Sequence, residues 1–325
     1  MAPLGRGISA RRRFARRTSF DFANNYTGIE SIPEIASFAD AVAQRSDGGV
    51  RIRFRNGWAA ATDPQEEVTL ALDVARGRAD LGWVGSRVFG KLGVTAFDPL
   101  ETPFLLRSHE RQRLVLESGI AEEMLGSLQA IGLVGLAILP GEQRKPFGFR
   151  RPFVETSDFE GAVIQTHASA VSEATYAALG ASATPDGAPA APRGRALLDG
   201  MDLHPSALAE YGFTGFLTWN VNLWPRMPVI VMNRDRFAAL PVPTQDLLRA
   251  AAADTVGHAI SGHGGDDGRS ELERQDGLVI VESTEAQLAG FAQRVEIVRR
   301  QLLNDAGASG FLQRIEAVLP PGDDL

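Results

Sequence analysis

The sequence predicts an α/β fold divided into two domains. Short apolar or alternating segments with strand character are repeatedly followed by segments whose apolar residues return at helical spacing. A chain of 325 residues with 44% hydrophobic content can bury a substantial core and is long enough for two domains. Because strands and helices alternate, mainly parallel sheets are favoured.

The first third of the chain contains three predicted strands. Residues 18–24 are expected to form the first strand, and residues 32–43 have the apolar spacing of a helix. Strict alternation over 50–54 predicts a strand with one buried face. A helix over 64–76 is then followed by the strand expected at 79–84.

The middle of the chain continues this pattern. Helical spacing recurs at 110–116 and 120–130, and the continuous apolar run at 133–139 predicts a buried strand. Residues 140–152 are expected to leave that strand for the second domain. A short strand containing Val163 and Ile164 leads into a helix over 171–179 and a turn at Gly180 and Ala181.

The remaining segments predict one loop, one return crossing and two helices. Residues 182–195, rich in proline and glycine, are expected to be irregular. Residues 217–225 are expected to cross back to the first domain, because 228–233 is again a buried-strand pattern. Helices are expected at 244–260 and 286–303, the second long enough to brace both domains.

Composition excludes several classes of protein. The net charge of −7 argues against nucleic-acid binding, so no nucleic-acid partner is predicted. The absence of cysteine excludes disulfides, thiolate metal sites, cysteine nucleophiles and a lipoprotein anchor. The longest apolar runs, such as 131–140, fall well short of the roughly 20 residues that span a bilayer.

No catalytic residue, metal or cofactor is predicted. His258 and His263 are five positions apart, whereas a spacing of four aligns two ligands on a helix face. The HExxH, GxSxG and GxxxxGK[ST] motifs do not occur in the sequence. Residues 263–267, which include two aspartates, are expected to form a solvated loop rather than a metal site.

Several motifs occur in a fixed order, namely GRADLGWV at 77–84, TPFLL at 102–106, GL at 132–133, RKP at 144–146 and DGMD at 199–202. Together they resemble the solute-binding proteins of tripartite ATP-independent periplasmic (TRAP) transporters over about residues 20–318. The resemblance implies a two-domain, periplasmic-binding-protein-like (type II) fold with mixed, mainly parallel sheets, a ligand cleft between the domains and a long C-terminal bracing helix. It also implies a monomeric extracytoplasmic receptor that closes around a small solute and delivers it to a TRAP membrane permease.

The resemblance further implies domains that are discontinuous in sequence, since the family's sheets exchange strands. Domain I is expected to comprise 18–142 plus 226–265, and domain II 143–225 plus 266–325, with a hinge near 140–146 and 219–226. Residues 1–17 are expected to be a disordered or engineered arm. No apolar export core of about 7 to 15 residues follows its arginines. A processed, misassigned or engineered start is therefore expected, with a cytoplasmic copy as the alternative.

Gln165 is the most discriminating ligand-binding candidate. Most family members place here, four residues after the glycine matching Gly161, an arginine that clamps the solute carboxylate. A glutamine lacks that charge, which would weaken carboxylate binding by about one to two decades unless another cation compensates. A neutral, zwitterionic or cationic solute is therefore expected, with His167 as a second contact. Alternatively, Gln165 satisfies backbone groups at the strand end and His167 is an exposed residue before the helix.

Four further candidates are polar or phenolic. Arg144 matches a family arginine that faces the cleft and could donate two parallel hydrogen bonds to a carboxylate. Asp202 could accept from a solute hydroxyl or amine, or could cap the helix expected near Pro205. Asn24 and Tyr26 match a segment that lines the cleft in relatives. The alternatives are a surface charge for Arg144 and an ordinary turn for Asn24 and Tyr26.

The last candidates are aromatic and amide side chains. Trp83 ends a predicted strand, and Trp219 and Asn222 lie at the expected crossing between domains. Such groups suit a polyol, sugar derivative, heterocycle or quaternary amine through stacking, cation–π attraction and hydrogen bonds, although buried tryptophans are more often core. An enzyme or ligand sensor that reuses the same scaffold is the alternative function.

Overall fold

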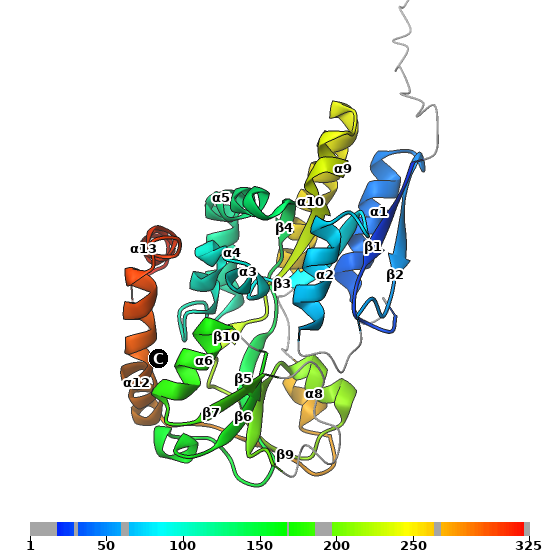
Figure 1. Cartoon of the computed structure of the whole chain (residues 1–325). Helices are drawn as coiled ribbons and strands as arrows, with labels where there is room; N and C mark the ends of the chain where they lie inside the picture. Colours follow the sequence, from blue (N-terminus) through cyan, green and yellow to red (C-terminus); the bar gives the residue numbers. More distant parts are fainter. Residues whose placement is uncertain are drawn as a thin grey trace, which may run out of the picture.

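The structure is a computed structural model that describes residues 18–28, 32–59, 65–167, 169–185, 197–262 and 268–321. Its described residues form two β-sheets, each flanked by helices, and the chain crosses between the two sheets (Figure 1). This arrangement confirms the predicted α/β class. No helix in the described ranges combines the length and apolarity that crossing a membrane requires.

The first sheet has five strands in the order β2-β1-β3-β11-β4. Strand β1 pairs in parallel with β2 and β3, whereas β11 runs antiparallel between β3 and β4. A late segment of the chain thus completes a sheet begun at the N-terminal end. The bounds are β1 (Thr18–Ala23), β2 (Val50–Arg55), β3 (Leu81–Gly85), β4 (Leu133–Ile138) and β11 (Pro228–Asn233).

Helices cover both faces of this sheet, which explains why β11 is apolar at nearly every position. Val229 and Val231 pack into a cluster that includes α2 (Glu66–Ala75), whereas Ile230 and Met232 pack against α1 (Pro33–Arg45) and α10 (Val242–Gly262). Successive side chains of a strand point to opposite faces, so a strand covered on both sides needs apolar residues throughout.

The second sheet has seven strands, ordered β12-β9-β5-β8-β6-β7 with β10 paired to β5. Strand β6 is parallel to β7 and β8, and β9 to β12, whereas β5 is antiparallel to β8, β9 and β10. Both sheets are therefore mixed. The bounds are β5 (Gln143–Gly148), β6 (Val163–Thr166), β7 (Ser182–Pro185), β8 (Gly200–Leu203), β9 (Gly215–Thr218), β10 (Trp224–Pro225) and β12 (Leu278–Val281).

Shorter helices fill the connections around both sheets. Among them, α6 follows β6 and α8 follows β8. Their bounds are α3 (Val88–Lys91), η1 (Thr95–Glu101), α4 (His109–Glu117), α5 (Ile120–Ser127), η2 (Leu128–Ile131), η3 (Thr156–Phe159), α6 (Ala170–Ala178), α8 (Pro205–Tyr211), α9 (Arg234–Ala238) and α11 (Arg269–Leu272).

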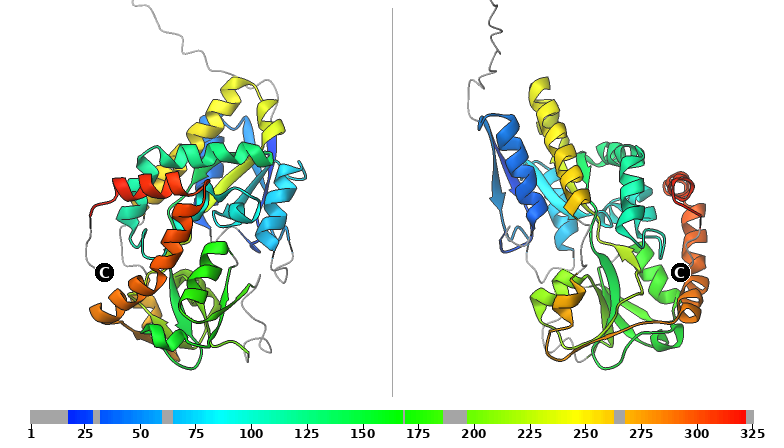
Figure 2. Two further views of the ribbon diagram at one scale, coloured as in Figure 1. Left: turned by 60° about the vertical axis from the view of Figure 1, so that its left-hand side comes forward. Right: turned by 180° about the vertical axis from the view of Figure 1, so that it is seen from behind.

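The two C-terminal helices extend along both halves of the molecule (Figure 2). The long helix α12 (Glu285–Asn304) packs on α6, and Phe291 meets Phe159 edge-on with ring centroids 5.7 Å apart. The next helix, α13 (Ser309–Val318), packs against η1, α4 and α5, which belong to the half containing the first sheet. The expected bracing helix is thus confirmed.

One element differs from the sequence-based expectation. Residues 182–195 were expected to form a loop, but Ser182–Pro185 is strand β7, in parallel register with Val163–Thr166. Proline is tolerated there because β7 is an edge strand and Pro185 is its last residue. Residues 186–195 of the expected loop lie outside the described residues, as do the arm 1–17 and the run at 263–267.

Candidate functional site

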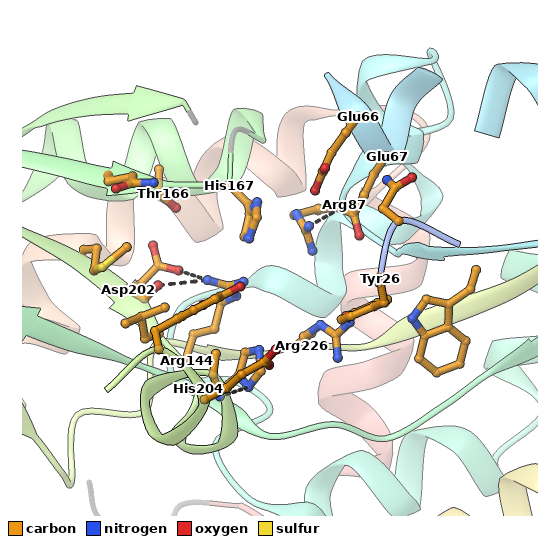
Figure 3. Close-up of a pocket in the computed structure, with 18 residues that line it drawn as sticks. Tyr26, Glu66, Glu67, Arg87, Arg144, Thr166, His167, Asp202, His204 and Arg226 are labelled. Atoms are coloured by element: carbon orange, nitrogen blue, oxygen red, sulfur yellow. Dashed lines mark hydrogen bonds and ion pairs between the residues drawn. The ribbon is translucent and has the colours of Figure 1, made fainter. Parts of the chain in front are cut away.

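A polar cleft lies between the two sheets, with a volume of about 1040 Å³ including its open mouth (Figure 3). From the first sheet it is lined by residues that follow β1, lie in or follow β3, or begin α2: Asn25, Tyr26, Glu66, Glu67, Trp83 and Arg87. From the second sheet and its crossings the polar lining residues are Arg144, Gln165, Thr166, His167, Asp202, His204, Glu210, Tyr211 and Arg226.

The position of the cleft follows from the strand directions. Strands β1, β3 and β6 all end at it, so the loops after their carboxyl ends supply side chains from both halves. In open α/β sheets small molecules bind in this place. Gln165, at the end of β6, thus lines the cleft together with Thr166 and His167, as does Trp83 near the end of β3.

Arg144 and Asp202 line the cleft but are engaged with each other. The Nη1 atom of Arg144 lies 2.5 Å from Oδ1 of Asp202 and 2.9 Å from its carbonyl oxygen. Their side chains are 5% and 0% exposed, and Tyr176 donates to the other carboxylate oxygen at 3.0 Å. Burial, followed by the charge of Asp202, raises the pKa of Tyr176 well above its usual value, so its hydroxyl stays protonated.

Arg87 forms a second ion pair in the cleft, with Glu67 at the start of α2. Glu67 also accepts from the backbone N–H of Gly85 at 3.2 Å. A Cβ atom at Gly85 would lie 2.2 Å from Nη1 of Arg87, so the glycine that ends β3 leaves the space that this guanidinium occupies. The pair therefore fixes the first-sheet wall of the cleft.

The two histidines of the cleft are neutral at pH 7. Burial lowers the pKa of His204 to about 4, and its Nδ1 lies 2.8 Å from Oε2 of Glu142. Burial opposes ionisation of Glu142, but its contacts with His204 and Ser206 lower its pKa to about 2. For His167, burial and then the charges of nearby arginines hold the pKa well below its usual value. Both imidazoles therefore present uncharged hydrogen-bonding groups.

Three of the predicted ligand residues lie outside the lining of this cleft. The carbonyl oxygen of Trp219 accepts from Lys145 at 2.5 Å, and its ring lies 4.5 Å from the Lys145 ammonium. Asn222 accepts from the same ammonium and donates to the carbonyl of Arg107 at 3.0 Å. These residues hold the crossing around a buried lysine.

Asn24 is the third predicted residue that does not line the cleft, but it orients Tyr26, which does. Its Oδ1 accepts from the backbone N–H of Tyr26 at 3.1 Å, and its Nδ2 donates to Asn56 at 2.8 Å. Asparagine commonly makes such local turns with the backbone two residues later. Tyr26 itself lines the cleft, where its hydroxyl accepts from Arg226 (Figure 3).

Sequence reasoning missed several lining residues, of which Arg226 is the most consequential. The available signal was a basic residue between Pro225 and Pro228, at the end of the hinge segment expected over 219–226. Glu66, Glu67, Arg87 and the α8 residues were missed because their approach to the cleft depends on the relative placement of the two sheets.

The comparisons with known proteins fit this geometry. The family model DctP, described as bacterial extracellular solute-binding protein, family 7, matches residues 31–187. A sugar acid binding protein from Advenella mimigardefordensis in complex with galactonate has a TM-score of 0.80 at 19% identity, covering 94% of this chain and 99% of that one. No curated protein matches the chain significantly.

Two TRAP periplasmic solute-binding proteins show the same fold. The one from Bradyrhizobium sp., in complex with galacturonate, has a TM-score of 0.79 at 21% identity, with coverage of 92% of this chain and 99% of that chain. The one from Sulfurospirillum deleyianum, with bound succinate, has a TM-score of 0.79 at 17% identity, with coverage of 94% and 100%. The structural matches show that this chain has the type II, two-domain fold of these proteins. Within that class, the predicted resemblance to the TRAP solute-binding proteins is confirmed.

Proposed function

We propose that this protein is an extracytoplasmic receptor that captures a small polar solute between its two halves and delivers it to a TRAP membrane permease. The observation that carries the proposal is the cleft itself, which is lined from both sheets by charged and neutral hydrogen-bonding side chains. A solute that contacts both walls binds the closed form better than the open one, and this difference alone is sufficient to drive closure.

The crossings between the sheets support hinge closure. The chain leaves the first sheet after β4, enters β5, and returns from β10 to β11, so two crossings lie side by side behind the cleft. Closure about a few residues at such crossings is a common motion of two-domain binding proteins. The proposed domains remain 18–142 plus 226–265 and 143–225 plus 266–325.

A receptor is favoured over an enzyme or sensor on the same scaffold because the matched family and neighbours are solute-binding proteins. The neighbours' bound galactonate, galacturonate and succinate support a small organic acid as the solute class. Gln165 lines the cleft, so we propose that the usual arginine clamp does not hold the solute here.

A thermal-shift screen of the full chain tests the receptor function. The panel contains sugar acids, dicarboxylates, neutral sugars, polyols, amino acids and amines. A ligand at 100 times its dissociation constant stabilises the folded state by about 2.7 kcal/mol, and X-ray scattering with the same ligand should show a smaller radius of gyration. The proposal is refuted if no member raises the unfolding midpoint, or if the best ligand leaves the radius unchanged.

A further inference from the structure

The three arginines that line the cleft differ in the partners they already have. Arg144 is paired with Asp202 and Arg87 with Glu67. The guanidinium of Arg226 instead donates to the phenolic oxygen of Tyr26, and it forms no ion pair with a carboxylate in the described ranges (Figure 3). Among these three arginines, Arg226 is therefore the one whose charge is not neutralised by a directly contacting carboxylate of the described chain.

Arg226 remains charged although it is half-buried. Burial opposes the charge, but Tyr26 and more distant carboxylates, Glu67 first among them, outweigh that effect and raise the pKa of Arg226. Electrostatic attraction is stronger where water is partly excluded. An anion that enters the cleft would therefore meet, at Arg226, a charged guanidinium that no carboxylate among the described residues contacts directly.

The backbone of Arg226 is held firmly in place. Its N–H donates to the carbonyl of Glu142 at 2.8 Å, and the neighbouring Pro225 is in register with Gln143 of β5. A Cβ atom at Gly141 would lie 1.6 Å from the Arg226 carbonyl oxygen, so the two crossings approach as closely as glycine permits. A donor fixed before binding loses less conformational entropy when a ligand arrives.

We propose that Arg226 binds the carboxylate of a small hydroxy acid, in place of the arginine that position 165 lacks, and that Tyr26 donates its phenolic hydrogen to the same carboxylate. The proposal rests on the receptor function proposed above. A guanidinium presents several donors in one plane, which suits a planar carboxylate. Because the phenolic oxygen already accepts from Arg226, its own hydrogen can be directed toward an anion.

The opposite wall matches the hydroxyl groups of such an acid. Thr166 and His167 line it at the end of β6, and His167 is neutral because burial and nearby arginines lower its pKa. A hydroxyl and a neutral imidazole can each donate and accept hydrogen bonds. Gln165 alone led us to expect a neutral, zwitterionic or cationic solute, unless another cation replaced the missing arginine charge. Arg226 is that cation in this proposal, so the expected solute becomes an acid.

The test compares acids with neutral molecules of the same shape. Calorimetric titration and thermal shift of the full chain would use galacturonate against galactose, galactonate against galactitol, and succinate against succinamide. The best-bound acid should bind about 10- to 100-fold more tightly than its neutral counterpart, the range expected for a charged hydrogen bond. Arg226→Gln should abolish this preference while leaving the neutral counterpart unchanged.

Arg51→Gln is the matched control, because Arg51 is an exposed arginine on β2 outside the cleft. It should bind each acid as the parent chain does. Arg226→Lys keeps the charge but loses the planar donor pair, so it should weaken acid binding by about three- to tenfold. This variant keeps the test decisive if Arg226→Gln does not fold.

The outcomes separate this proposal from the receptor function. If neutral members bind the parent chain as tightly as acids, or Arg226→Gln retains the acid preference, the assignment of Arg226 is wrong while the receptor function stands. An Arg87→Gln variant that alone loses the preference would move the anion site to Arg87 and also overturn the assignment. If no member of any class binds the parent chain, the receptor function fails and the assignment with it.

Discussion

Replacing Glu101 with glutamine should make the protein more stable at alkaline pH and leave it unchanged in acid. Glu101 and Asp98 lie on η1 and are 3% and 6% exposed. Burial is the main cause that raises the pKa of each carboxyl to about 7, and each is further raised by a neighbouring carboxylate. For Glu101, a hydrogen bond from Ser169 and the charges of two cleft arginines oppose the increase without overcoming it.

The sign follows from the protonation states. Folding favours the neutral carboxyl, so its stabilising effect is fully present below the ordinary value of 4.5 and is lost as pH rises through about 7. The difference between these pKa values corresponds to about 3 kcal/mol for Glu101 alone. Asp98 titrates in the same range, but the two effects do not add, since the charge of Glu101 is one of the causes that raise the pKa of Asp98.

Urea unfolding of Glu101→Gln and the parent chain at pH 5 and pH 8.5 measures this effect. Glutamine keeps the size and the hydrogen-bonding ability of the neutral carboxyl, so the stabilities of the two proteins should differ by less than about 1 kcal/mol at pH 5. At pH 8.5 the variant should be more stable by about 2–3 kcal/mol, at an unchanged m-value. Glu122→Gln, an exposed change on α5, is the control and should follow the parent chain. If the free energy of unfolding changed with pH equally in Glu101→Gln and in the parent chain, this reasoning would be refuted.

Three further substitutions test the packing around the cleft by urea unfolding at pH 7. Tyr176→Phe removes the 3.0 Å hydrogen bond to buried Asp202 and should cost about 1–3 kcal/mol; an unchanged midpoint would mean that this bond does not form. Phe291→Ala should cost about 3–5 kcal/mol by leaving a cavity beneath α12, and a cost below 1 kcal/mol would contradict its complete burial. Gly141→Ala should destabilise the crossing, because its Cβ would lie 1.6 Å from the Arg226 carbonyl oxygen, and normal stability would contradict that close approach.

Local pattern predicted most elements but not the partners within the cleft. The buried run at 228–233 is strand β11, and the long helical pattern at 286–303 lies within α12. Such periodicity reflects which faces the residues bury, so it is visible in a single sequence. The edge strand β7 was missed because its four residues precede a proline- and glycine-rich stretch and gain their order from pairing with β6.

The cleft chemistry was harder to predict because its contacts join distant segments. Arg144 meets Asp202 at a separation of 58 residues, and Arg226 meets Tyr26 at 200. The sequence suggested Arg144, Asp202 and Tyr26 as separate candidates but could not show that two of them neutralise each other. Nor could it show that an arginine in the return crossing faces the same space as Gln165.

The junction between α12 and α13 restricts how the two halves can move. Asp305 accepts from Thr95 of η1 at 2.7 Å and from the backbone N–H of Ala308 at 2.9 Å, and it thereby fastens the C-terminal helices to the half containing the first sheet. With α12 seated on α6, this fastening adds a third tether beside the two crossings. Three tethers suppress sliding and twisting, so the halves should swing about a single axis.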